Sequence, residues 1–216
     1  MLRDIVLCLF IGYIFGCFQT GYIYGKCHGI DIRQYGSGNA GTTNTLRVLG
    51  KKAGYITYLG DALKAIIAIL LVEHLVYGQL LVPSLSFQLL LAYTGLGVAF
   101  GHNYPFYLKF KGGKGIAVTS GVMLALDLRI GLIGIIGFFI IFFATRYVSV
   151  GSLYMSLAFP VSVLIFYPGQ WHLFAVSVVF WLMAWMRHRE NIKRLLHGNE
   201  NRFERKKRVK RIDFFT

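Results

Sequence analysis

A series of long apolar segments separated by short polar loops constrains the fold of this chain more than any other feature. A bilayer core about 30 Å thick is crossed by about 20 residues of helix. Hydrophobic residues make up 56% of the 216 residues and charged residues only 15%, which excludes a water-soluble surface. Seven candidate segments cover residues 4–25, 53–76, 86–104, 115–126, 130–145, 149–166 and 171–187. The sequence predicts an all-α integral membrane protein with seven transmembrane helices.

The fourth segment, residues 115–126, is shorter than a bilayer span and follows a glycine-rich stretch, Gly112–Gly115. Irregular backbone is tolerated at membrane depth where other protein segments bury it. We therefore expect one short helix beside a glycine-rich loop.

The distribution of basic residues predicts the orientation, because Lys and Arg collect in short cytoplasmic loops. Of the 23 Lys and Arg residues, 20 follow the first, third, fifth or seventh segment. Arg3 and Arg129 fall on the opposite side, and Lys64 lies within a segment. We expect the N-terminus outside and the C-terminus in the cytoplasm, with one transmembrane domain over residues 1–200 and a basic cytoplasmic tail over 201–216. Every unusual polar cluster then lies on the cytoplasmic side.

The formal net charge of +14 suits anionic lipid or a phosphorylated substrate. The apolar segments make nucleic acid the least favoured partner. The three cysteines, Cys8, Cys17 and Cys27, lie near the first segment without metal-ligand spacing, so we interpret them as packing residues.

The first polar cluster runs from Gly36 to Arg47. Its glycines, hydroxyls and amides can form an anion-binding concavity, which an arginine can close with forked hydrogen bonds to a phosphate. The alternative is a flexible polar loop with basic membrane anchors. The candidate residues are Ser37, Gly38, Asn39, Gly41, Thr43, Asn44 and Arg47.

The second cluster joins Gly101-His102 to the glycine-rich loop that precedes the short helix. Glycines at a helix start allow unpaired N–H groups to approach a phosphate, and Lys114 adds a positive charge. The order of residues around Lys114 does not match a nucleotide-binding P-loop. The alternative is a basic glycine-rich turn. The candidate residues are His102, Gly112, Gly113, Lys114 and Gly115.

The third cluster follows the last segment, where His188 and Asn191 are three residues apart and share one helix face. An interfacial role is the alternative for this pair. Within the second segment, Asp61 and Lys64 have the same spacing, and we expect a buried ion pair that is structural at least as readily as catalytic.

In order and separation, the three clusters resemble the motifs of the bacterial PlsY family, which transfers a fatty acyl group from acyl phosphate to glycerol 3-phosphate. The resemblance extends from the first helix to about Glu200. The matching positions are Gly36–Arg47, Gly101, His102, Pro105, Lys111–Gly115, Arg187–Arg194, Gly198 and Glu200. One departure follows Lys114: family members usually have x-Ala-Thr there, and this chain has Ile116-Ala117-Val118-Thr119.

The resemblance implies seven helices with the N-terminus outside, matching the charge distribution. It implies acyl phosphate as donor, glycerol 3-phosphate as acceptor, and 1-acyl-glycerol 3-phosphate (lysophosphatidic acid) and phosphate as products. It implies no cofactor and no metal, a multi-pass location in the bacterial inner membrane, and a role in phospholipid synthesis. We expect a monomer whose active site faces the cytoplasm.

On this basis, we expect Ser37, Arg47, Lys114 and the backbone of Gly112 and Gly113 to hold the donor phosphate. His188 and Asn191 would orient the acceptor or the reacting carbonyl. The supporting residues of the pocket are Gly38, Asn39, Gly41, Thr43, Asn44, His102 and Gly115. Ser37 is expected to bind phosphate, and a covalent acyl-enzyme on its hydroxyl is the alternative. The competing function is a transporter or lipid-binding protein for phosphorylated anions.

Overall fold

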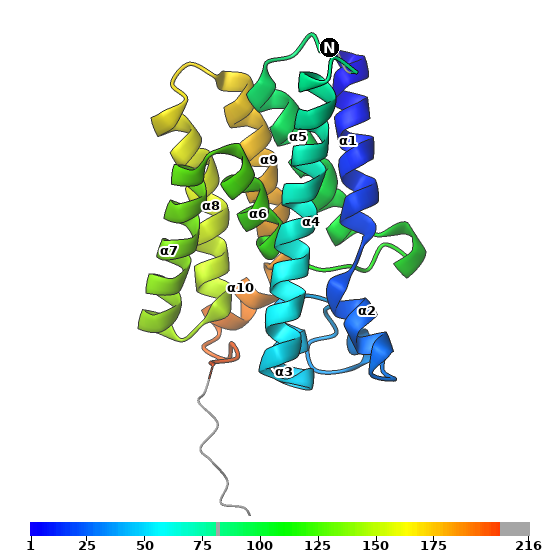
Figure 1. Cartoon of the computed structure of the whole chain (residues 1–216). Coiled ribbons are helices and arrows are strands. Elements are labelled where there is room, and N and C mark those ends of the chain that lie inside the picture. The colour runs from blue at the N-terminus through cyan, green and yellow to red at the C-terminus, as the bar shows by residue number, and fades with distance from the viewer. Residues whose placement is uncertain (81–82, 204–216) are drawn as a thin grey trace, which may run out of the picture.

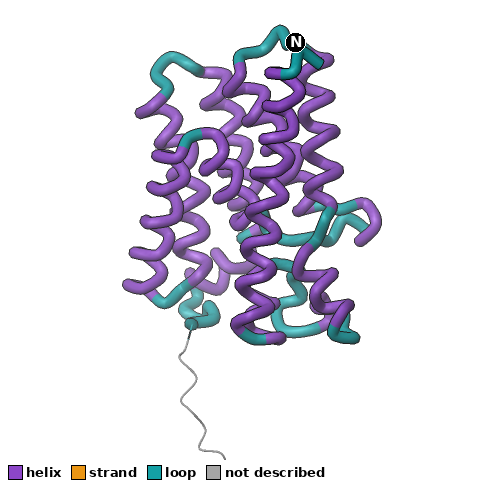
Figure 2. The backbone as a smooth tube through the Cα atoms, viewed as in Figure 1, coloured by secondary structure: helices purple, strands orange, loops and turns teal. Residues whose placement is uncertain are grey.

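The computed structural model describes residues 1–80 and 83–203, and all regular structure in that part of the chain is helical (Figure 2). The α-helices are α1 Leu2–Cys17, α2 Thr20–Cys27, α3 Thr42–Leu49, α4 Lys51–Tyr77, α5 Phe87–Asn103, α6 Ile116–Leu126, α7 Leu128–Thr145, α8 Val148–Phe166, α9 Trp171–Arg187 and α10 Arg189–Leu196. Two short 3₁₀ helices, η1 Ile32–Gln34 and η2 Phe106–Leu108, lie in the loops. The basic tail predicted from residue 201 lies outside the described residues from position 204 onward.

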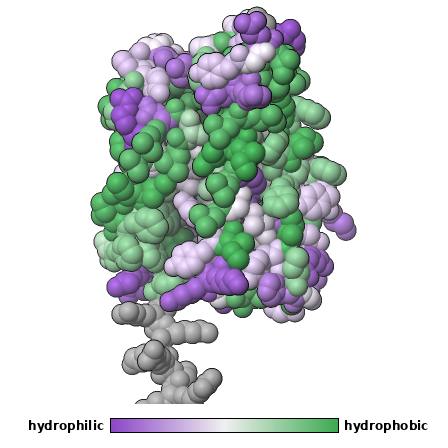
Figure 3. Space-filling model, in the orientation of Figure 1, coloured by the Kyte–Doolittle hydropathy of each residue, from purple (hydrophilic) through white to green (hydrophobic). Residues whose placement is uncertain are grey.

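Each predicted apolar segment is helical, which confirms the all-α class. Three stretches are long and apolar enough to cross a membrane by length and composition: Leu2–Cys27, Leu128–Thr145 and Val148–Phe166. The helix α6 has only 11 residues and follows the glycine-rich loop, as predicted. A hydrophobic band lies between more hydrophilic ends of the molecule (Figure 3). Seven membrane crossings and the sides of the two termini remain predictions.

The first predicted segment, residues 4–25, is not one helix. It is interrupted at Phe18, which is extended and caps α1, and α2 begins at Thr20. The interruption leaves backbone carbonyls without helical partners inside an apolar bundle, where an unsatisfied polar group is costly. Lys64 of α4 donates to the carbonyls of Gly16 and Phe18. A buried lysine on another helix therefore compensates for the break.

Close packing of α1 on α5 depends on two pairs of glycines, each with a spacing of four residues. A β-carbon on Gly12 or Gly16 would lie 2.0 or 2.2 Å from a carbonyl oxygen of α5. A β-carbon on Gly97 or Gly101 would lie 2.4 or 2.2 Å from a carbonyl oxygen of α1. Small residues at this spacing allow helix backbones in membranes to approach closely.

The remaining helices complete a bundle in which α4 packs on α6, α6 on α7, α7 on α8 and α8 on α9. Its core is built from aliphatic and aromatic side chains such as Ile69, Met123, Phe159 and Phe180. The N-terminus lies at one end of the bundle, and α2, α3 and α10 lie at the other (Figure 1). All three polar clusters therefore gather at the end opposite the N-terminus.

Candidate active site

The loop before α3 is organised by the buried side chain of Asn44. Its Nδ2 group donates to the carbonyls of Ile32, Tyr35 and Asn39, at 2.9 to 3.1 Å. Its Oδ1 accepts from the backbone N–H of Ser37 at 2.8 Å. These contacts use both polar ends of the amide, so Asn44 shapes the loop, and its role in substrate binding stays a prediction.

Asn39 connects the first cluster to the second. Its Oδ1 accepts from the N–H of Gly41, which caps α3, and its Nδ2 donates to the carbonyl of Gly112 at 3.4 Å. Ser37 and Gly38 are exposed in the same loop, and Thr43 is half-buried in the first turn of α3. The hydroxyl of Ser37 makes no hydrogen bond to residues 1–80 or 83–203. It is therefore available to a ligand.

Arg47 stands near the C-terminal end of α3, with one Nη2 hydrogen bond to the carbonyl of Asn201 at 3.5 Å. That bond is long, and the residue is exposed on the protein surface. Most of the guanidinium donors thus remain available for an anion.

The glycine-rich loop before α6 is held between α5 and α9. The N–H of Gly112 donates to the carbonyl of Asn103, and the N–H of Gly113 donates to the carbonyl of His102. On the other side, Arg187 donates to the carbonyls of both glycines at 2.9 to 3.1 Å. The two amides predicted to hold phosphate are therefore engaged within the protein.

Close packing explains why this loop contains glycines. A β-carbon on Gly112 would lie 2.0 Å from the carbonyl oxygen of His102, and one on Gly113 would lie 2.0 Å from Nε2 of the same residue. Gly115 caps α6 with φ of +84°, a left-handed conformation that favours glycine. His102 itself is 2% exposed and packs against the loop, and its role in substrate binding stays a prediction.

Lys114 connects the second cluster to the third through a chain of hydrogen bonds. Its Nζ donates to Oδ1 of Asn191, and Nδ2 of Asn191 donates to Glu200 at 2.8 Å. The second carboxylate oxygen of Glu200 accepts from Nε of Arg194 at 2.7 Å. Asn191 is thereby fixed with its oxygen toward the lysine ammonium, as donors and acceptors must pair.

The cluster around Lys114 carries excess positive charge. Burial lowers the pKa of Lys114 to about 8, and the positive charges of Arg194, Arg187 and Arg47 contribute in the same direction. The carboxylate of Glu200 acts in the opposite direction. Mutual repulsion among cations that are partly withdrawn from water is relieved when an anion binds between them.

His188 lies between α9 and α10 and is 4% exposed. Burial lowers its pKa to about 4, with the nearby Lys114 charge as the second cause. Its Nδ1 lies 2.8 Å from the carbonyl of Ala184, which can only accept, so the proton of the neutral ring is on Nδ1. The lone pair of Nε2 can then accept a hydrogen bond from a substrate hydroxyl.

The structure therefore connects Asn39 to the glycine-rich loop, and Lys114 to Asn191, as the predicted clusters required. Arg187, Arg194 and Glu200 were not among the predicted site residues. Their position within the third cluster could have indicated a role in the site. Charged side chains beside a predicted phosphate site either bind the ligand or position the side chains that bind it.

The comparisons with known proteins agree on one family. A family model described as glycerol-3-phosphate acyltransferase matches residues 6–198. A glycerol-3-phosphate acyltransferase of Thermoanaerobacter sp. (strain X514) is 40% identical over 206 residues, which cover 95% of this chain and 98% of that protein. One from Prochlorococcus marinus (strain NATL1A) is 39% identical over 201 residues, covering 91% and 97% of the two chains.

Two solved structures share the fold. The crystal structure of PlsY (YgiH), an integral membrane glycerol 3-phosphate acyltransferase, in its glycerol 3-phosphate form has a TM-score of 0.81 and 33% identity, with 93% of this chain and 96% of that one covered. The lysophosphatidic acid form of PlsY (YgiH) has a TM-score of 0.79 and 34% identity, covering 93% and 95%. The chain belongs to the glycerol-3-phosphate acyltransferase family that includes PlsY, and it is a membrane acyltransferase.

Proposed function

We propose that this protein transfers a fatty acyl group from acyl phosphate to the sn-1 hydroxyl of glycerol 3-phosphate, with 1-acyl-glycerol 3-phosphate and phosphate as products. The observation that carries the proposal is the cluster of positive charge that Arg47, Arg187 and Arg194 form around Lys114, in a protein built of apolar helices. Both substrates carry a phosphate, and the donor also carries an acyl tail that partitions into lipid. The names of the relatives and of the two PlsY structures support the acceptor and the product.

The phosphate groups are held by side chains more than by the glycine amides. Lys114 supplies a partly desolvated ammonium, and Arg47 supplies a forked set of donors. The exposed hydroxyl of Ser37, in the loop before α3, adds a neutral hydrogen-bond donor. The positive end of the α6 dipole lies next to Lys114 and favours the same charge.

The reaction needs little covalent assistance, because an acyl phosphate is an activated mixed anhydride. The acceptor hydroxyl oxygen attacks the acyl carbonyl carbon, the bond between that carbon and the phosphate oxygen breaks, and phosphate leaves with the electron pair. The hydroxyl proton ends on the released phosphate. The protein contributes by holding both substrates in contact and by neutralising charge on the leaving group.

His188 orients the acceptor in this mechanism, and Asn191 acts through Lys114. Neutral His188 presents its Nε2 lone pair to the hydroxyl, and its low pKa makes it a weak base suited to orientation. Asn191 fixes the direction of the Lys114 ammonium. Ser37 acts as a hydrogen-bond donor and not as a nucleophile, since no base is bonded to its hydroxyl among the described residues.

The proposal places the site on the cytoplasmic side of the bacterial inner membrane, in a monomer with one transmembrane acyltransferase domain over residues 1–200. The alternative of a transporter or lipid-binding protein for phosphorylated anions has no support from the relatives, which are named acyltransferases. Liposomes with purified protein separate the two: transport of either phosphate compound without acyl transfer would contradict the enzyme.

The donor and the role of Ser37 are tested together. Purified protein is supplied with acyl phosphate, acyl-CoA or acyl carrier protein and with glycerol 3-phosphate, and product is measured; turnover only with the thioesters would refute the proposed donor.

Intact-protein mass spectrometry after rapid quench with acyl phosphate alone should show no added acyl mass. An adduct on wild type that disappears in Ser37→Ala would show that the serine is a nucleophile.

A further inference from the structure

A buried polar cluster inside the bundle is formed by Asp61 and Lys64 of α4 and His102 of α5. Nζ of Lys64 lies 2.9 Å from Oδ1 of Asp61 and 2.9 Å from Nδ1 of His102. The three side chains are 1 to 5% exposed. The predicted ion pair between Asp61 and Lys64 is therefore present, and it includes a histidine that the sequence spacing did not predict. Burying charged groups inside a membrane bundle is costly. Such groups are retained for function or because they pair with another buried polar group.

Lys64 determines which nitrogen of His102 carries the proton. A lysine ammonium only donates hydrogen bonds, so Nδ1 of His102 accepts and the ring proton lies on Nε2. That Nε2 faces the glycine-rich loop, where a β-carbon on Gly113 would lie only 2.0 Å away. The ring thus has Lys64 on one edge and Gly113 against the other.

His102 and Arg187 hold the same peptide from opposite sides. The carbonyl of His102 accepts from the N–H of Gly113 at 3.0 Å and also from the side chain of Gln19 at 3.0 Å. The carbonyl of Gly113 accepts from Arg187. The next residue is Lys114, whose ammonium meets Asn191 in the candidate site. The position of Lys114 therefore depends on how firmly His102 supports Gly113.

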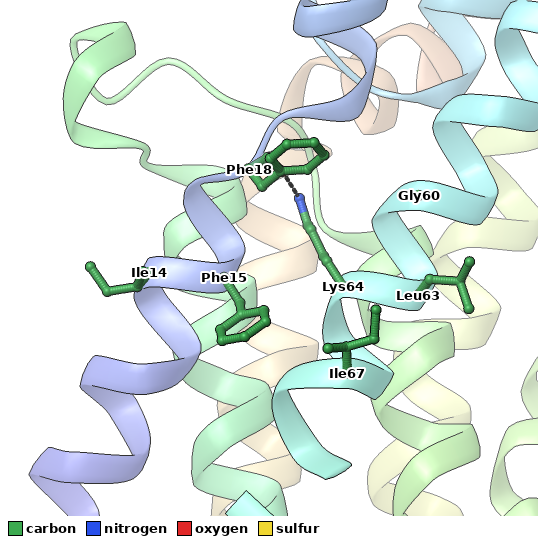
Figure 4. A pocket seen from close by; sticks show the side chains of 7 residues that line it. All are labelled: Ile14, Phe15, Phe18, Gly60, Leu63, Lys64 and Ile67. Atoms are coloured by element: carbon green, nitrogen blue, oxygen red, sulfur yellow. Dashed lines mark hydrogen bonds between the residues drawn. The ribbon is translucent and has the colours of Figure 1, made fainter. Parts of the chain in front are cut away.

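Lys64 lies away from the phosphate-binding cluster. Its side chain extends from α4 past Gly60 toward the carbonyl of Phe18, at an apolar groove between α1 and α4 (Figure 4). The groove is lined by Ile14, Phe15, Leu63 and Ile67. Among the described residues, Lys64 makes no hydrogen bond or ion pair with Arg47, Lys114 or Asn191, so any effect on catalysis must pass through its neighbours.

We propose that Lys64 is a positioning residue for acyl transfer: through His102, it holds the Gly112–Gly113 peptide so that Lys114 faces the bound phosphate. This inference rests on the proposed function, because its main readout is acyl transfer. The simpler role, in which Lys64 only neutralises Asp61, makes a different prediction. In that case, removing both charges together would restore full activity.

The test uses Asp61→Asn as the background and compares it with Asp61→Asn/Lys64→Met, which contains no unpaired buried charge from this pair. We expect kcat/KM to be about tenfold lower in the double variant, since small misplacement of a binding group has effects of this size or larger. The double variant should nevertheless melt at the same or a higher temperature than Asp61→Asn, which retains an unpaired buried ammonium. Lys52→Met, at an exposed lysine near the start of the same helix, is the matched control and should retain wild-type turnover.

A double-mutant cycle establishes the route. If Lys64 acts through Lys114, adding Lys64→Met to Asp61→Asn/Lys114→Ala costs less than twofold. A full tenfold loss in that background, or equal activity of Asp61→Asn with and without Lys64→Met, would overturn the proposal.

A second readout does not require turnover. The ¹⁵N spectrum of labelled histidines, assigned with His102→Gln, should show the Nε2–H tautomer for His102 in the wild type and a changed tautomer balance in Asp61→Asn/Lys64→Met. An Nδ1–H ring in the wild type would contradict the inference. Absence of acyl transfer in the wild type would instead refute the proposed function. The spectrum would still show whether Lys64 donates to Nδ1 of His102.

Discussion

Replacing Glu200 with glutamine tests the charge balance around Lys114. The carboxylate accepts one hydrogen bond from Nδ2 of Asn191 at 2.8 Å and one from Nε of Arg194 at 2.7 Å. A glutamine amide has one oxygen, so it can accept from only one of these donors and turns its NH₂ group toward the other. Loss of one charge-assisted hydrogen bond costs about 1.5–3 kcal/mol. Because Arg194 is partly exposed, we expect the lower figure, which corresponds to a loss of about tenfold in kcat/KM.

The same substitution changes the ionisation of Lys114. The pKa of Lys114 is about 8, lowered first by burial and then by neighbouring arginines, and the Glu200 carboxylate opposes that decrease. Without the carboxylate, the pKa of Lys114 decreases further. One charge several ångströms away contributes roughly 1–2 kcal/mol at an effective dielectric constant of ~20, or about one pH unit. Because phosphate binding requires the ammonium, activity is lost as pH rises through this pKa, and the loss should begin about one unit lower in Glu200→Gln.

The assay is the pH dependence of kcat/KM for glycerol 3-phosphate, which reports ionisations of the free enzyme. Glu190→Gln is the matched control, because Glu190 lies on α10, is exposed, and is 3.5 and 3.6 Å from Arg189 and Lys193. Exposed ion pairs of this kind contribute little. The control should keep the wild-type profile. If Glu200→Gln kept it as well, the charge of Lys114 would not be set by this cluster.

Two further substitutions test the phosphate site and the glycine-rich loop. Arg47→Lys keeps the charge but removes the forked donors, so most of kcat/KM should be lost, and near-normal turnover would exclude Arg47 from the phosphate site. Gly113→Ala introduces a methyl group 2.0 Å from Nε2 of His102, which Lys64 prevents from moving away. Overpacking of this kind costs about 1–3 kcal/mol, so we expect a lower melting temperature in detergent together with lower kcat; an unchanged melting temperature would contradict the close packing.

Hydropathy predicted the helical segments because local apolar length determines where helices form in a membrane protein. The interruption at Phe18 was not predictable in this way, since Phe18 and Gln19 are compatible with a continuing helix. One residue that stabilises the open end of α1 is Lys64, 46 positions away from Phe18 in the sequence. A contact over that separation is set by how α1 and α4 pack.

The residue types of the candidate site were predictable, but the atoms that face a ligand were not. Glycines beside a lysine predicted phosphate-binding amides, yet the amides of Gly112 and Gly113 pair with α5. Asn44 was predicted to line the pocket, yet its side chain organises the first loop. In both cases the partners lie only 5 to 12 residues away along the chain, so these hydrogen bonds depend on how each loop folds back on itself, which the order of residue types does not show.

The glycine pairs of α1 and α5 connect the packing of the bundle to the site. A β-carbon on Gly101 would lie 2.2 Å from the carbonyl of Tyr13, so α5 can lie this close to α1 only with glycine at that position. The next residue is His102, whose carbonyl is reached by Gln19 just after the break in α1 and whose ring is reached by Lys64. If the two helices moved apart, His102 would be displaced from Gln19. The close packing of α1 and α5 therefore determines the position of His102. Through His102, it also determines the positions of Gly113 and Lys114.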